Sequence, residues 1–139
     1  MVINETLNPV LWNEDNTLKP GIAESINRIV QRFVTDLEVP INIVDIRLVG
    51  SNAAYNYTEH SDVDIHIVVS TIGMLYSKEA LKIIYNNARN KFNREYNIAI
   101  KGLPIEVSIE DLDSNVCSNG VYSVTQARWI KVPQRLIVK

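Results

Sequence analysis

The sequence is poor in the residues that build disulfides and zinc sites. It contains one cysteine, Cys117, and two histidines, His60 and His66, in 139 residues. One cysteine cannot form an internal disulfide, and these residues do not have the spacing of a zinc ligand set. A disulfide-stabilised secreted domain and a structural zinc domain are therefore excluded, and the reducing cytoplasm is the expected compartment.

Long hydrophobic runs and a net basic charge are also missing. No apolar run reaches the roughly 18 residues that a membrane-spanning helix needs, and the N-terminus lacks the charged-then-apolar pattern of a signal peptide. The formal net charge is −2. We therefore do not expect the whole surface to attract nucleic acid, although a local basic patch stays open.

The chain does have enough apolar sequence for one folded unit. Hydrophobic residues make up 46% and charged residues 22% of it, which is ordinary for a globular domain and argues against disorder. At this length we expect a single domain. Within it we expect an N-terminal arm over residues 1–20, a core over 21–111 and a C-terminal extension over 112–139 that packs on the core.

Two segments have the apolar periodicity of helices. The first runs from Ile22 to Leu37, and Pro20 could begin it, because proline is tolerated at the first helical position. The second runs from Ser77 to Tyr96, with the Ser77 hydroxyl as a plausible N-cap. Both carry a buried stripe, so we expect them to pack on a common core.

Several shorter segments have the patterns of strands. Apolar runs at 43–49 and 63–69 predict two strands, and residues 98–109 predict a hairpin that turns at Lys101-Gly102. After the turn signal Asn119-Gly120 we expect one or two short strands. Strands and helices therefore mix along one chain.

The most informative stretch is Gly50-Ser51, followed after ten residues by Asp62-Val63-Asp64-Ile65. Side chains alternate across a strand, so Asp62 and Asp64 should point the same way, roughly 7 Å apart. Two such carboxylates repel unless a cation lies between them, and Mg²⁺ accepts carboxylate and phosphate oxygens. Gly50 would let a phosphate approach the backbone, and Ser51 would begin a short helix whose free N–H groups favour an anion.

A third acid is expected from a neighbouring strand. In the segment 104–109 the apolar residues alternate with Glu106 and Ser108, so Glu106 should project from one face of the strand. Glu110 shares that face but lies near the strand's end, and Asp111 is out of phase. Glu106 is therefore the expected third carboxylate.

Taken together, these residues resemble the DNA polymerase β-like nucleotidyltransferase superfamily. In that superfamily a strand ending in Gly-Ser or Gly-Gly precedes an acid-hydrophobic-acid-hydrophobic strand and a later strand with one more acid. Gly50-Ser51, Asp62-Val63-Asp64-Ile65 and Ile105-Glu106-Val107 fit in order and spacing. The resemblance covers about residues 22–109, and it implies an α/β (α+β) fold with a small mixed β-sheet, helices packed on one face and a palm-like core.

The resemblance also implies a chemistry. Asp62, Asp64 and Glu106 would bind two Mg²⁺ or Mn²⁺ ions, and Gly50 and Ser51 would hold the phosphates of a nucleoside triphosphate. A nucleoside monophosphate would pass to a hydroxyl acceptor with release of pyrophosphate.

The sequence does not identify the acceptor molecule. The larger members of the superfamily add a domain that selects the base, and this chain has no room for one, so it resembles the minimal members, some of which modify a partner protein. RNA, protein, a nucleotide or a small molecule could each be the acceptor. Base selection would then come from the N- and C-terminal arms, from a second copy of the chain or from a partner. The flanking segments resemble those of small nucleotidyltransferases of tailed phages, which would place the protein in a host cytoplasm.

Two other interpretations compete with catalysis. A core that keeps its acids but lacks an acceptor platform could be a nucleotide sensor or a structural component of an assembly. Alternatively, Asp62 and Asp64 are surface acids of an unrelated α/β domain. Three unpaired carboxylates on one face are destabilising without a cation, which favours the enzyme.

The remaining candidates each have two interpretations. Tyr55 and Tyr57 could line a nucleotide pocket or pack, and Ser61 precedes the acids as it often does in the resembled superfamily. His66 shares the face of the acids and could contact a phosphate or pair with a carboxylate. Trp12 could stack on a base or pack in the core. Two sets of cations could contact phosphate or be surface charges: Lys78, Lys82, Arg89, Lys91 and Arg94 on the second helix, and Arg128, Lys131 and Arg135 near the C-terminus.

Overall fold

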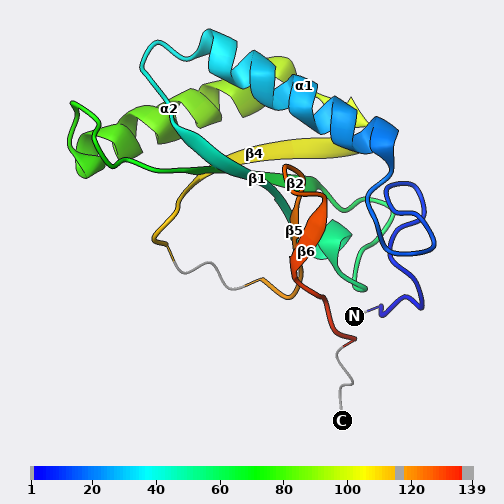
Figure 1. The fold of residues 1–139 in the computed structure, drawn as a ribbon. Coiled ribbons are helices and arrows are strands. Elements are labelled where there is room, and N and C mark those ends of the chain that lie inside the picture. The colour runs from blue at the N-terminus through cyan, green and yellow to red at the C-terminus, as the bar shows by residue number, and fades with distance from the viewer. Residues whose placement is uncertain (1, 115–117, 136–139) are drawn as a thin grey trace.

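The protein is built on a mixed β-sheet with two helices on one face, as the computed structural model shows for residues 2–114 and 118–135 (Figure 1). The elements are α1 (Pro20–Asp36), β1 (Ile43–Val49), the single 3-10 turn η1 (Ser51–Ala53), β2 (Val63–Val69), α2 (Lys78–Tyr96), β3 (Ala99–Ile100), β4 (Leu103–Asp111), β5 (Val121–Ser123) and β6 (Arg128–Lys131). The predicted fold class is confirmed.

The strands lie in the order β3-β4-β2-β1-β5-β6. Among the strands of the described residues, only β2 and β4 are parallel, and α2 lies in the connection between them, as parallel neighbours require a crossover. The other neighbouring pairs are antiparallel. The predicted strands at 43–49 and 63–69 and the hairpin at 101–102 are confirmed.

Local signals explain where the helices begin and end. Pro20 is the first helical residue of α1, and the helix ends before the extended Leu37. The Ser77 hydroxyl accepts a hydrogen bond from the Ala80 N–H at 3.1 Å, and α2 ends at Asn97 in a left-handed conformation. No helix in the described ranges is long and apolar enough to cross a membrane.

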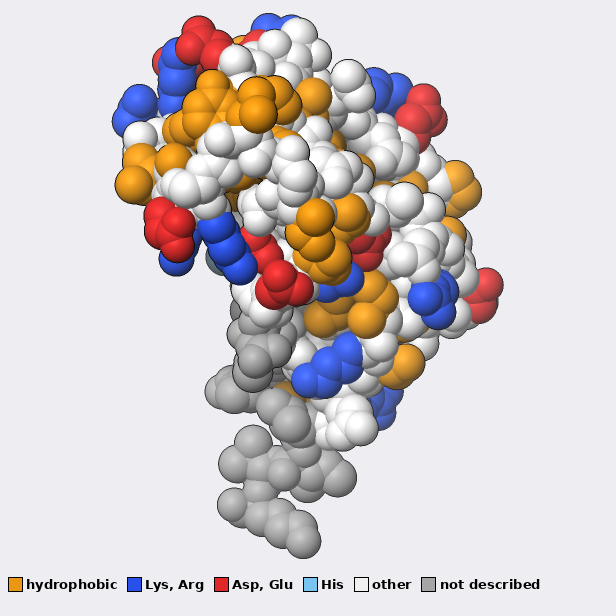
Figure 2. Space-filling view, turned by 60° about the vertical axis from the view of Figure 1, so that its left-hand side comes forward, with side chains coloured by type: hydrophobic (Ala, Val, Ile, Leu, Met, Phe, Trp, Pro, Cys, Tyr) orange, Lys and Arg blue, Asp and Glu red, His pale blue; other side chains and the backbone are white. Residues whose placement is uncertain are grey.

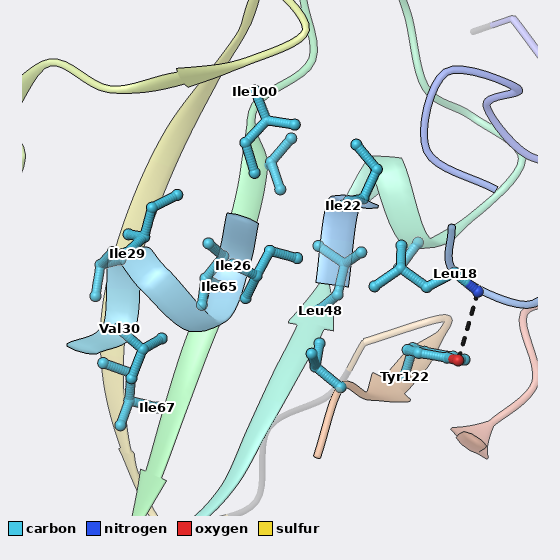
Figure 3. Packing of buried hydrophobic residues seen from close by; sticks show 14 of the residues in the cluster. Leu18, Ile22, Ile26, Ile29, Val30, Leu48, Ile65, Ile67, Ile100 and Tyr122 are labelled. Carbon is cyan, nitrogen blue, oxygen red and sulfur yellow. Dashed lines mark hydrogen bonds between the residues drawn. The ribbon is translucent and has the colours of Figure 1, made fainter. Parts of the chain in front are cut away.

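The core lies between the helices and the sheet (Figure 3). Along β2, Val63, Ile65 and Ile67 are fully buried, while Asp64 and His66 point to the opposite, open face. The burial of these alternate residues fixes the register of β2, because a shift by one residue would put the acids into the core.

The N-terminal arm and the strands β5 and β6 pack on this core. Trp12 is buried, its ring stacks on Trp129 at 4.7 Å between centroids, and Tyr122 meets it edge-on at 5.0 Å. The packing role of Trp12 is therefore confirmed, and so are the short strands β5 and β6. Cys117 and the apolar segment 136–138 lie outside the described residues.

Candidate active site

The strand register brings three carboxylates together. Asp64 and Glu106 are direct partners in the parallel pair of β2 and β4, and Asp62 comes just before β2. One carboxylate oxygen from each residue lies within 4.8 Å of the other two. The phase of Glu106 predicted from the sequence agrees with this arrangement, because Val107 is buried and Glu106 is exposed.

The cluster concentrates negative charge around a half-buried group. The pKa of Asp64 is raised to about 6, first because burial removes its carboxylate from water and then because Glu106 and Asp62 repel its charge, while His66 partly offsets this. Arg89 is the nearest cation to Glu106 at 3.8 Å, and both side chains are partly exposed. A divalent cation would relieve this repulsion, and carboxylate oxygens are the ligands that Mg²⁺ and Mn²⁺ prefer, so the three residues fit such an ion.

The raised pKa of Asp64 predicts pH-dependent metal binding. A carboxylate with a folded pKa of about 6 is mostly protonated below that pH, and its proton competes with the cation. We expect Mn²⁺ to bind about tenfold more tightly at about pH 7 than at about pH 5. Isothermal titration calorimetry measures the two affinities, and equal affinities would contradict the prediction.

The raised pKa of Asp64 also determines how the stability of the metal-free protein changes with pH. The folded pKa of Asp64 lies above its ordinary value of 3.8, so the folded state holds the proton more tightly than the unfolded state. This group's contribution to stability is therefore present at low pH and is lost as the pH rises from about 4 to about 6. Metal binding would offset that loss.

The turn after β1 is adapted to the acids. Val49, the last residue of β1, pairs with Asp64, so Gly50 lies directly beside the Asp64 side chain. Gly50 has a φ of 79°, and a Cβ at this position would lie 2.2 Å from Asp64 Oδ2. Ser51 then begins the 3-10 turn η1, whose first N–H groups lack partners within the turn. The predicted short helix is confirmed, although it is a single turn.

Asn52 is a residue that sequence reasoning missed. Its side chain is fully buried, and its Nδ2 donates to the backbone oxygens of Ser61 at 2.9 Å and Asp62 at 2.8 Å. Its Oδ1 accepts from the Asn8 side chain at 3.0 Å, and its backbone oxygen accepts from the Trp12 indole at 2.7 Å. Asn52 therefore ties the turn after β1, the loop before β2 and the N-terminal arm together. The available signal was a polar residue directly before the small apolar residues Ala53 and Ala54.

Replacing Asn52 should loosen Asp62. In Asn52→Ala the backbone of residues 61 and 62 loses both amide donors, so the Asp62 carboxylate is no longer held against its partners. We expect Mn²⁺ affinity to fall by about 10- to 100-fold, the usual cost of losing a residue that orients a metal ligand. Calorimetry measures it, and Asn56→Ala, an exposed asparagine in the same loop, is the control. Equal affinities in the two variants would contradict this role.

The other predicted residues lie around the cluster rather than in it. The Ser61 hydroxyl accepts from the Thr58 N–H at 2.8 Å and so holds the loop before Asp62. Tyr55 packs against the core, and the Arg135 guanidinium lies 5.2 Å from its ring. The backbone oxygens of Tyr55 and Tyr57 accept from the Asn4 side chain at 3.0 and 2.8 Å. These contacts give Ser61, Tyr55 and Tyr57 a structural role in the loop. A role of these residues in nucleotide binding stays a prediction.

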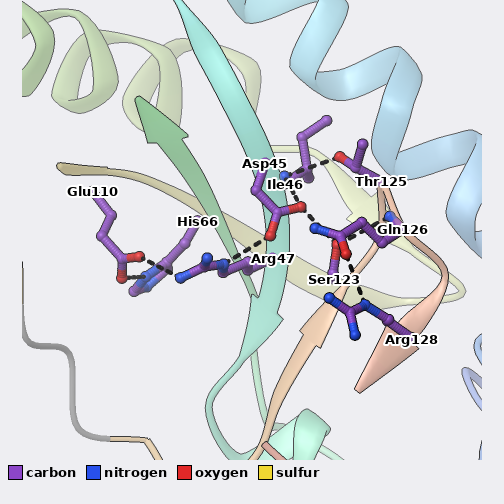
Figure 4. Close-up of polar contacts among 9 residues, drawn as sticks. All are labelled: Asp45, Ile46, Arg47, His66, Glu110, Ser123, Thr125, Gln126 and Arg128. Carbon is purple, nitrogen blue, oxygen red and sulfur yellow. Dashed lines mark hydrogen bonds and ion pairs between the residues drawn. The ribbon is translucent and has the colours of Figure 1, made fainter. Parts of the chain in front are cut away.

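His66 belongs to a polar network on the open face of the sheet (Figure 4). Its Nδ1 lies 3.1 Å from the buried Glu110, which in turn pairs with Arg47 at 3.4 Å. Arg47 also bonds the buried Asp45 at 2.8 Å, and the Ser123 hydroxyl donates to Asp45 at 2.7 Å. The structural interpretation of His66 is therefore supported, and Glu110 is engaged away from the acid cluster.

The sets of predicted cations are dispersed. Arg89 approaches the site, where it also lies 3.4 Å from the Ser108 hydroxyl, while Lys78 pairs with Asp111 at 3.6 Å. Arg128 bonds the Gln126 side chain, and Arg135 donates to the Glu5 backbone oxygen. On the face turned forward in Figure 2, cationic and anionic side chains are mixed rather than gathered by sign.

Comparison with known proteins gives one distant structural similarity. No protein-family model matches the sequence, and a search of curated proteins finds no match. The structure is similar to the crystal structure of a Sulfolobus solfataricus protein provisionally assigned as a nucleotidyltransferase, with 14% sequence identity, a TM-score of 0.43, and coverage of 78% of this chain and 86% of that chain. At this TM-score the fold description rests on the chain's own topology, in which a mixed sheet brings Asp62, Asp64 and Glu106 together at one end.

Proposed function

We propose that the protein is a metal-dependent nucleotidyltransferase that moves a nucleoside monophosphate from a nucleoside triphosphate to a hydroxyl acceptor. The observation that carries this proposal is the convergence of Asp62, Asp64 and Glu106 beside the glycine turn at Gly50. Three carboxylates in one place are costly unless they bind a cation, and Gly50 lacks the Cβ that would collide with the Asp64 carboxylate, so the turn lies directly against the cluster.

Asp62, Asp64 and Glu106 would hold two Mg²⁺ or Mn²⁺ ions, which neutralise the triphosphate and lower the pKa of the acceptor hydroxyl. Gly50 and the first N–H groups of η1 bind the β- and γ-phosphates. The acceptor oxygen forms a bond to the α-phosphorus, and the bond from that phosphorus to the β-phosphate oxygen breaks. Pyrophosphate leaves with the electron pair of that bond.

The exposed carboxylate is suited to the acceptor side. The Glu106 side chain is 49% exposed, whereas Asp64 is half-buried beside Gly50. We therefore assign Glu106 to the incoming hydroxyl, whose proton it accepts, while Asp64 would serve as a metal ligand. Asn52 acts as a positioning residue, since it holds the backbone of Asp62 and does not contact the substrate.

The test is a transfer assay with radiolabelled nucleoside triphosphates, Mg²⁺ or Mn²⁺, and candidate acceptors. We expect pyrophosphate release and label transfer, both lost in Asp62→Ala. Glu59→Gln, in the same loop with a side chain 85% exposed, removes one charge without touching the cluster and is the control. Nucleotide binding without pyrophosphate release would instead identify a sensor. A protein that neither binds nucleotide nor releases pyrophosphate would refute the proposal.

A further inference from the structure

A groove runs along α1 on the side of the helix that faces the edge strand β3. It has a volume of about 710 Å³, and four cations line it: Lys19, Arg28, Arg32 and Lys101. Its floor is apolar and includes the buried Ile22 and Ile100. Among the described residues, no carboxylate lines this groove. In a chain with a net charge of −2, it is a local concentration of positive charge.

We propose that this groove binds the sugar-phosphate backbone of a single-stranded nucleic acid, which makes the acceptor a polynucleotide. The assignment of the strand as acceptor rests on the proposed function, whereas the binding itself does not. Cations along the rim would pair with phosphates, and the isoleucine floor would contact sugars and bases. A volume of about 710 Å³ suits a few nucleotides.

The cations of the groove are available to phosphate. Arg28 pairs with Glu24 at 3.0 Å, but both side chains are more than two-thirds exposed. An exposed pair of this kind contributes little, so a phosphate can replace Glu24 at Arg28. Arg32 lies 3.8 Å from the Asp36 carboxylate in another exposed pair that a phosphate can replace. Its Nε donates to the Tyr96 hydroxyl at 3.3 Å, and its guanidinium lies 5.2 Å from the Tyr96 ring, at the far end of the groove.

Lys101 occupies a position that disfavours lysine. It is the first residue of the two-residue turn between β3 and β4, and both turn residues have positive φ, 51° at Lys101 and 81° at Gly102. Asn-Gly is the preferred sequence for such a turn, because asparagine tolerates the left-handed conformation. The chain therefore carries a cation at a strained position on the groove, and the fold alone does not account for this choice.

The groove lies at the end of the sheet where β4, the strand that carries Glu106, begins. The turn at Lys101 leads into β4, and Glu106 follows five residues later, at most about 17 Å along the strand. On the opposite wall of the groove, Lys19 directly precedes α1. Lys19 follows the N-terminal arm, in which the Trp12 indole donates a hydrogen bond to the Asn52 backbone oxygen. The groove lies on the helix side of the sheet and the acids on the open side. A strand that leaves the groove past the turn can therefore bring its end to Glu106.

Fluorescence anisotropy with labelled single strands of about 12 nucleotides, without metal or triphosphate, tests the binding. RNA and DNA strands are measured in separate experiments. Four phosphate contacts predict an affinity about 50-fold weaker at about 200 mM than at about 50 mM NaCl. The double variant Arg28→Gln/Lys101→Asn should bind about tenfold more weakly or worse at the lower salt concentration, with a salt effect of only about sevenfold.

The design separates charge loss from misfolding. Asparagine relaxes the turn at position 101, so the Lys101→Asn variant should melt no lower than the parent while it loses affinity. The double variant Arg128→Gln/Lys131→Gln removes the same charge from β6 and should bind as the parent does. Equal loss in both double variants, no binding at all, or equal competition by a glutamate oligomer would each overturn the groove assignment.

The outcome does not depend on the proposed function. Strand binding is measured without turnover, so it should persist in Asp62→Ala. If the groove variants bind normally while Asp62-dependent pyrophosphate release is observed, the groove assignment fails and the proposed function stands. If strand binding follows the groove but no pyrophosphate is released, the proposed function fails and the groove is a nucleic-acid site.

Discussion

The variant Asp64→Asn is expected to lose nucleotidyl transfer by about 10³-fold or more, because several kcal/mol of transition-state stabilisation depend on the bound ions. The amide keeps the shape of the carboxylate but removes the charge that the proposed metal binding would require. Of the three acids, Asp64 is the one whose charge is disfavoured by burial and by both of its neighbours. Its loss should therefore have a second, opposite effect.

Without metal, Asp64→Asn should melt at a higher temperature than the parent at about pH 7, because the folded protein no longer holds an ionised carboxylate whose pKa is raised to about 6. At about pH 4, where that carboxylate is mostly protonated in the folded state, the gain should shrink. Mn²⁺ should raise the melting temperature of the parent and not of the variant. Differential scanning calorimetry measures all three effects.

Asp113→Asn is the matched control, since this aspartate is exposed on the loop after β4 and outside the cluster. It should leave both activity and the Mn²⁺ effect unchanged. An Asp64→Asn variant that is less stable than the parent without metal would show that this carboxylate is held by favourable contacts. Its proposed role as the central ligand would then be wrong.

The sequence was sufficient for the elements that carry the acids. Val63, Ile65 and Ile67 must be buried, so Asp64 must project to the other face, and the same alternation places Glu106. These are local rules, in which each residue's neighbours determine its face. The predicted limits of β1 and β2 agree with the structure for the same reason.

The contacts that hold the site could not be predicted in this way. Asn52 bonds Asn8, which is 44 residues away, and Trp12 stacks on Trp129. The network of Asp45 and Ser123 joins β1 to β5 across 78 residues. Such pairs depend on the strand order, and a single sequence gives no signal for which distant polar groups meet.

The structure links these distant contacts to the candidate site. Asp64 and Glu106 stand on strands whose register is fixed by the core, whereas Asp62 and Gly50 lie at the ends of the loop over 50–62. That loop is held by Asn52 and, through it, by the N-terminal arm. Geometry at the cluster should therefore be more sensitive to changes in the loop than to changes on the helices.

Gly50→Ala is the strongest expected effect among changes outside the acids. A methyl group would lie 2.2 Å from Asp64 Oδ2, so the carboxylate must rotate or the turn must move. A displacement of about 1 Å in a reacting site can cost about 100-fold in rate. We expect activity to fall by at least about 100-fold, measured as pyrophosphate release, together with weaker Mn²⁺ binding in calorimetry.

Backbone strain must be separated from this crowding, because Gly50 has a φ of 79° and alanine there costs about 1–2 kcal/mol of stability on its own. Gly73 provides the matched control, since it has a φ of 78° and no atom within 4 Å of an added Cβ. Gly73→Ala should lose similar backbone stability and keep its activity. If Gly50→Ala also keeps its activity, the placement of the Asp64 carboxylate against the turn does not matter for the reaction, and the proposed role of Asp64 as a metal ligand would be wrong.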